Sequence, residues 1–231
     1  MRFYLAPMEG ITGYIYRNAY EKFFHNIDKY FTPFIVPNKS RSLKTKELRD
    51  ILPENNEGMN IVPQILTNDF EGFIVTARKL QQLGYNEVNL NLGCPAGTVV
   101  SKNRGSGFLA LREELDKFLE EIYKIEDMKI SIKTRIGKDT PEEFYKLIEI
   151  YNKYPLEELI IHPRTRQDFY GNKPNLEIFK DALSLSKSPV CYNGDIFIVE
   201  NYNKLVNSFP EVDKVMLGRG VLRSEEHTSE L

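Results

Sequence analysis

Short apolar runs rich in β-branched residues recur along the chain and alternate with stretches whose apolar residues are three or four positions apart. The first pattern predicts strands and the second predicts amphipathic helices. Eight strand-then-helix units predict an α/β fold, the (β/α)8 or TIM barrel, in which loops at the C-terminal ends of the strands carry the chemistry. The predicted strands are Phe3–Met8, Tyr30–Val36, Ile61–Leu66, Val88–Gly93, Lys129–Ile136, Leu159–Arg164, Val190–Asp195 and Lys214–Gly218.

Two of the predicted helices have clear sequence signals. Apolar residues at helical spacing run from Phe108 to Ile122, and Thr140-Pro141-Glu142-Glu143 has the spacing of a capping box with proline at the first helical position. Little sequence follows the eighth strand, so we expect a catalytic barrel over residues 1–222 that lacks its final helix. Residues 223–231 resemble a translated sequencing adapter, and we expect a non-native tail there; the alternative is a genuine acidic tail.

The composition describes a soluble globular protein, because 41% of the residues are hydrophobic and 28% are charged. No segment predicts a secretory signal or a membrane span, so we expect a cytoplasmic protein. The net charge of −2 becomes +1 when Ser224–Leu231, with three Glu and no Lys or Arg, is removed. Two cysteines on separate predicted strands make a disulfide unexpected, and three histidines without paired spacing predict no metal site.

A cysteine stands where the fourth predicted strand ends. Asn89 and Asn91 alternate with apolar residues, so one face of that strand carries amides. Gly93 and Pro95 end the strand and leave Cys94 on the turn. We interpret Cys94 as catalytic, although a free cysteine can also be a small buried core residue.

Polar residues also end most of the other predicted strands. Each could be structural: His162 could be a satisfied core histidine, and Lys133 could belong to an ion pair. Together they predict a shared ligand, because polar groups buried without partners are costly. Glycines after the seventh and eighth strands predict a phosphate site, since backbone N–H groups can approach closely there. These polar and glycine positions are Glu9, Gln64, Lys133, Arg135, His162, Asn193, Gly194, Asp195, Gly218, Arg219 and Gly220.

The order of these motifs resembles the tRNA-dihydrouridine synthases over about residues 3–222. The resemblance implies an enzyme that uses FMN, with NADPH or NADH as hydride donor, to reduce the C5–C6 double bond of uridines in tRNA. It also implies a C-terminal helical domain, for which no sequence remains here. The motifs are Ala6-Pro7-Met8-Glu9-Gly10, Asn89-Leu90-Asn91-Leu92-Gly93-Cys94-Pro95, Lys133-Thr134-Arg135, His162-Pro163-Arg164-Thr165, Asn193-Gly194-Asp195 and Gly218-Arg219-Gly220.

The resemblance also implies residue roles. Cys94 would be the general acid that protonates uracil C5, and glycines 97, 105 and 107 would let its loop close over the base. Asn91, Arg135 and Tyr170 would bind the target base, although Tyr170 could equally be a packing aromatic. The FMN contacts would be Pro7, Met8, Glu9, Gln64, Lys133, His162, Asn193, Gly194, Asp195, Gly218 and Arg219.

The tRNA would need cations near the site. A basic segment follows the second strand, although such a run can also be an ordinary solvated face. Two other functions remain open: a dihydroorotate-dehydrogenase-like enzyme, in which the cysteine is a base, and a catalytically inactive RNA-binding barrel. The cations proposed to contact phosphates are Lys39, Arg41, Lys44, Lys46, Arg49, Lys102, Arg104, Arg164, Arg166 and Lys173.

Overall fold

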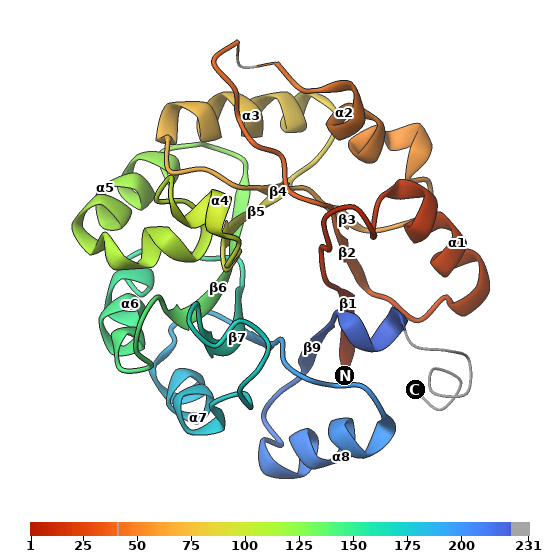
Figure 1. Cartoon of the computed structure of the whole chain (residues 1–231). Helices are drawn as coiled ribbons and strands as arrows, with labels where there is room; N and C mark the ends of the chain where they lie inside the picture. The colour runs from red at the N-terminus through yellow and green to blue at the C-terminus, as the bar shows by residue number, and fades with distance from the viewer. Residues whose placement is uncertain (41, 223–231) are drawn as a thin grey trace.

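The computed structural model describes residues 1–40 and 42–222. The predictions for Arg41 and for the tail at 223–231 therefore lie outside the described residues. Parallel strands form a ring that helices surround, which confirms the predicted TIM barrel (Figure 1). The strands are β1 (Arg2–Leu5), β2 (Lys29–Phe31), β3 (Ile61–Val62), β4 (Gln64–Ile65), β5 (Glu87–Leu92), β6 (Lys129–Gly137), β7 (Leu159–Thr165), β8 (Val190–Tyr192) and β9 (Lys214–Leu217).

The third predicted strand is split in two by a proline. The sheet order is β3-β2-β1-β9-β8-β7-β6-β5-β4, so β3 and β4 are its two ends. Pro63 lies between them and has no backbone N–H to donate to the ladder. Because β3 and β4 are consecutive in the chain, the ring closes at this proline, and a parallel bridge between Ile35 and Ile65 supports the closure.

The helices cover the outside of the ring (Figure 1). The predicted helix at Thr140-Pro141 is present, but it begins at Glu143 and its N-cap residue makes no side-chain hydrogen bond to the first turn. The segment around Phe108 differs, because a buried 3₁₀ helix, η2 (Gly105–Ala110), precedes α5, so the prediction that one helix starts near Phe108 is wrong. The α-helices are α1 (Tyr14–Phe24), α2 (Thr45–Ile51), α3 (Phe70–Gln82), α4 (Gly97–Val100), α5 (Arg112–Ile122), α6 (Glu143–Tyr151), α7 (Leu176–Leu185) and α8 (Val199–Ser208), and the other 3₁₀ helices are η1 (Pro53–Asn55) and η3 (Arg219–Leu222).

The alternation of side chains along the strands divides the interior into two parts. Outward residues such as Leu90 and Ile132 join the helices in one large apolar core, which provides most of the hydrophobic stabilisation. Inward residues form a smaller apolar layer that includes the fully buried Cys191. Gln64, Asn89 and Ser131 are also fully buried, so part of the barrel interior is polar.

Neither cysteine forms a disulfide in the structure. Among the described residues, no helix is both long enough and apolar enough to cross a bilayer. No group of three metal-ligating side chains occurs within residues 1–40 and 42–222.

Candidate active site

Two adjoining cavities lie where the barrel strands end. One, of about 450 Å³, reaches Cys94, and the other, of about 110 Å³, reaches the glycines after β8 and β9. Every predicted site residue except Gln64 lines one of them. The residues that border both cavities are Pro7, Met8, Lys133, His162, Tyr170 and Arg219.

The Cys94 turn is held by hydrogen bonds from three neighbours. Asn91 Oδ1 accepts from the backbone N–H groups of Gly93 at 3.0 Å and Cys94 at 2.9 Å. The Ser106 hydroxyl donates to the Cys94 carbonyl at 2.9 Å, and Arg135 Nε donates to the Gly93 carbonyl at 2.9 Å. The turn is therefore fixed by β5 itself, by η2 and by β6. Ser106 was not among the predicted site residues, because it carries no signal of its own in the sequence.

The glycine that precedes Ser106 is required for close packing. Gly105 has φ +54°, and a Cβ there would lie 2.8 Å from the Cys94 carbonyl oxygen and 3.0 Å from Cys94 Cβ. Both the left-handed backbone and the short contacts exclude a larger residue. The structure thus gives this glycine a packing role against Cys94, whereas its expected part in loop closure stays a prediction.

The surroundings of Cys94 favour the thiol over the thiolate. Burial raises the pKa of Cys94, while a backbone hydrogen bond from Ala96 and the charges of Arg135 and Lys133 offset part of that rise. A thiol with a raised pKa is protonated at neutral pH. Cys94 is therefore better suited to give a proton than to accept one.

Asn91 is supported in turn by the polar interior of the barrel. Its Nδ2 donates to Gln64 Oε1 at 2.7 Å, and Gln64 Nε2 donates to Asn89 Oδ1 at 2.8 Å. Asn89 Nδ2 then donates to Ser131 Oγ at 3.0 Å. Gln64 is fully buried and lines neither cavity. The structure thus places it behind Asn91, where it orients the amide that holds Cys94.

Lys133 presents an unpaired cation to both cavities. Its Nζ has no hydrogen bond or ion pair with any residue in the described ranges. Burial and the neighbouring Arg135 charge lower the pKa of Lys133 to about 8. Because an unpaired, half-buried cation is costly, the site favours a ligand that supplies an acceptor or a negative charge here.

The smaller cavity has the features of an anion site. The N–H groups of Gly194 and Asp195 have no partner among the described residues. A Cβ on Gly194 would lie 2.0 Å from Tyr192 Oη, and one on Gly220 would lie 2.1 Å from the Ile196 carbonyl oxygen. Only glycine lets the backbone come so close, and free N–H groups beside Lys133 can bind a phosphate.

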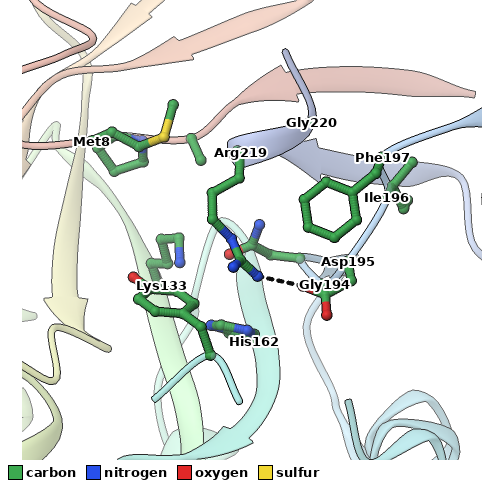
Figure 2. A pocket seen from close by; sticks show the side chains of 14 residues that line it. Met8, Lys133, His162, Gly194, Asp195, Ile196, Phe197, Arg219 and Gly220 are labelled. Carbon is green, nitrogen blue, oxygen red and sulfur yellow. Dashed lines mark hydrogen bonds and ion pairs between the residues drawn. The ribbon is translucent and has the colours of Figure 1, made fainter. Parts of the chain in front are cut away.

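The acidic residue of this cavity is already paired. Asp195 accepts hydrogen bonds from Arg219 at 2.7 Å and from Arg164, and Figure 2 shows the Arg219 contact. The Asp195 carboxylate is therefore neutralised, so only its N–H is available to an anion. Arg164 is 1% exposed, which corrects its predicted role as an RNA phosphate contact.

Tyr170 lies at the rim between the two cavities. The guanidinium carbons of Arg219 and Arg135 are 4.6 and 5.4 Å from the centre of its ring. Its loop is held by Asp168, which accepts from Thr165 and Asn172. With 50% of its surface exposed, Tyr170 is not a core aromatic, and its ring is positioned at the mouth of the site.

Comparison with known proteins identifies the family. The family model described as Dihydrouridine synthase (Dus) matches residues 4–225. The chain belongs to the dihydrouridine synthase family. It is 27% identical to a probable tRNA-dihydrouridine synthase of Staphylococcus aureus (strain COL), covering 98% of this chain and 73% of that protein. It is also 27% identical to a probable tRNA-dihydrouridine synthase 2 of Bacillus subtilis (strain 168), covering 95% and 68%.

Solved structures agree with the barrel fold. A histamine dehydrogenase from Rhizobium sp. 4-9 superposes with a TM-score of 0.69 at 14% identity, covering 94% of this chain and 43% of that one. A morphinone reductase mutant in complex with tetrahydroNAD superposes with a TM-score of 0.62 at 10% identity, covering 94% and 82%. At these identities, the likeness concerns the fold alone.

Proposed function

We propose that the protein is a cytoplasmic tRNA-dihydrouridine synthase, with residues 1–222 as its catalytic domain. It would reduce the C5–C6 double bond of uridine in tRNA, using FMN and either NADPH or NADH. The observation that carries this proposal is the Cys94 thiol in one of two adjoining cavities, with unpartnered backbone N–H groups and Lys133 lining the other. The printed names of the relatives in S. aureus and B. subtilis support the same substrate class.

The residues present fit FMN. The unpartnered N–H groups after β8 would bind its phosphate, with Arg219 as a further cation. Lys133 would meet an acceptor in the middle of the same ligand, since its ammonium faces both cavities. The other proposed FMN contacts are Pro7, Met8, Glu9, His162, Asn193, Asp195 and Gly218. Gln64, expected from the sequence to contact FMN, lines neither cavity and instead supports Asn91.

The chain's own chemistry is a proton transfer. When bound, reduced FMN supplies the hydride that is added to C6 of uracil. The electron pair released toward C5 then takes the proton of the Cys94 thiol, and the thiolate is reprotonated from solvent. Asn91 and Arg135 line the larger cavity and have donor hydrogens beyond those already used, and these can bind the uracil carbonyls. Tyr170 at the rim can stack on RNA.

The structure favours this chemistry over the two rivals. In a dihydroorotate-dehydrogenase-like enzyme, the cysteine must remove a proton, which a raised pKa at Cys94 disfavours. An inactive RNA-binding barrel would not need Lys133 unpaired beside a phosphate-sized cavity, because that arrangement costs stability unless a ligand offsets it.

The direct test is product formation. We would incubate the protein with FMN, unmodified tRNA transcript and NADPH, with NADH in a parallel reaction, and digest the RNA for mass spectrometry. The proposal predicts uridines that have gained a pair of hydrogens, and it predicts no oxidation of free dihydroorotate. FMN that binds and is reduced without any dihydrouridine in the transcript would contradict it.

A further inference from the structure

Arg164 uses nearly all of its donors on fixed partners. Nη1 and Nη2 donate to the two carboxylate oxygens of Asp195, at 3.1 and 2.5 Å, and Nε donates to the Asn172 carbonyl at 2.5 Å. Nη1 also lies 3.0 Å from Nε2 of His162. The side chain is buried, so its geometry is determined by these contacts.

The contact with His162 determines where that imidazole carries its proton. A guanidinium has only donors and stays charged, so it cannot accept a hydrogen bond from the ring. Nε2 must therefore be the acceptor, and a neutral ring then carries its proton on Nδ1. Nδ1 has no partner among the described residues, and His162 borders both cavities.

We propose that Arg164 is a positioning residue that fixes His162 as the neutral Nδ1–H tautomer, so that the site presents a hydrogen-bond donor to its ligand at this point. The role toward FMN rests on the proposed function, whereas the tautomer does not. A ligand with a carbonyl, a hydroxyl or an anionic nitrogen between its phosphate and the Cys94 end would meet two donors, Lys133 Nζ and His162 Nδ1.

Burial and the charges around the imidazole keep it neutral. Burial lowers the pKa of His162 well below its usual value, and the charges of Arg135 and Lys133 on β6, Arg164 on β7 and Arg219 on η3 lower it further. Asp195 is the acidic group nearby, and its carboxylate is occupied by the two arginines. Cys94, Tyr170 and Glu9 also line the larger cavity, and the Glu9 carboxylate is paired with Lys46.

The tautomer can be measured in the flavin-free protein by ¹⁵N NMR of the histidine rings at neutral pH. The chain has three histidines, so His162→Gln identifies the signals of His162. We expect Nδ1 to show the shift of a protonated nitrogen and Nε2 that of an unprotonated one. A ring protonated on Nε2, or on both nitrogens, would overturn the inference whether or not FMN binds.

Three variants test whether Arg164 is the cause. Arg164→Met removes every donor at similar side-chain length, and Arg164→Lys keeps the charge but has a single donor group. Arg78→Met removes an exposed cation on α3 that lines neither cavity, and it is the control. We expect mixed tautomers of His162 in Arg164→Met, a partial return to the Nδ1–H tautomer in Arg164→Lys and an unchanged spectrum in Arg78→Met.

Flavin binding gives the second readout. Arg164→Met should weaken FMN binding by roughly tenfold, as expected when a buried hydrogen-bond partner is removed, while Arg78→Met should bind FMN like the wild type. A folded Arg164→Met protein that keeps the pure Nδ1–H tautomer would refute the positioning role. If the tautomer is as expected but the wild type binds no FMN, the proposed function fails and the assignment of the tautomer stands.

Discussion

At the residue scale, Asn91 connects the barrel interior to the thiol that we propose as the acid. The sequence marked Asn91 as a polar residue of the site, but it could not show that Oδ1 caps two backbone N–H groups of the Cys94 turn. Such hydrogen bonds form between groups that only the folded chain brings together, so the type of a residue does not reveal them. The same limit applies to Gln64 and Ser106, whose partners lie 27 and 12 positions away in sequence.

We predict that Asn91→Leu destabilises the protein by about 1–3 kcal/mol for each N–H group left unsatisfied. The measurement is urea denaturation. Asn91→Leu removes three hydrogen bonds, two from backbone N–H groups and one to Gln64. Asn152→Leu is the control, because it removes two hydrogen bonds, at 2.8 Å each, at a partly exposed position where water can replace them. Equal losses of stability in the two variants would show that the Asn91 hydrogen bonds stabilise the protein no more than those of a partly exposed residue.

The raised pKa of Cys94 predicts a pH dependence for its proton transfer. A general acid works only while protonated, so the rate of flavin reoxidation by tRNA should stay level through neutral pH and fall as pH rises through the raised pKa. Stopped-flow absorbance of the flavin across pH would measure it. A rate that instead rises with pH in this range would indicate that the thiolate is the active form.

At the scale of elements, the hydrophobic periodicity predicted all eight barrel strands, because each must place apolar residues against the helices. What it could not predict was local. Pro63 splits the third strand, Pro33 follows a short β2, and the chain before α5 tightens into η2 to bury Phe108 and Leu109. These departures arise from single residues and from tertiary contacts, and the spacing of apolar residues over a whole segment does not reveal either.

The element η3 offers a test of the proposed phosphate site. Gly220→Ala would place a Cβ 2.1 Å from the Ile196 carbonyl oxygen, so η3 must shift and FMN binding should weaken. Overpacking of this kind typically costs about 1–3 kcal/mol of stability. Gly97→Ala is the control, since nothing lies within 4 Å of its Cβ. Unimpaired FMN binding by a folded Gly220→Ala protein would show that the phosphate does not bind beside η3.

At the scale of the whole molecule, exposed lysines occur at both ends of the barrel, and only those at one end lie near the cavities. Lys39, Lys44 and Lys46 follow β2 and belong to the end that carries the cavities, and Lys46 pairs with Glu9 at 3.0 Å. Lys124, Lys129 and Lys153 lie where α5 and α6 end and β6 begins, which is the opposite end of the barrel. The net charge of −2 hides this arrangement.

Replacing Lys39, Lys44 and Lys46 with Ala should weaken tRNA binding and reduce the slope of log affinity against log salt by up to about 2 to 3, at roughly 0.7–0.9 for each phosphate that a lysine no longer neutralises. The triple Ala variant at Lys124, Lys129 and Lys153 should keep the wild-type slope. If both triple variants change the slope equally, binding depends on net charge rather than on this face of the barrel.

The central claim is that Cys94 protonates uracil after hydride addition, and single-turnover kinetics of Cys94→Ala tests it most directly. The variant should bind FMN and be reduced by the nicotinamide donor at the wild-type rate, because that half-reaction does not use the thiol. Reoxidation of its reduced flavin by tRNA should slow by roughly 10²- to 10⁴-fold, the usual loss for a missing general acid. Reoxidation by tRNA at the wild-type rate would contradict the account.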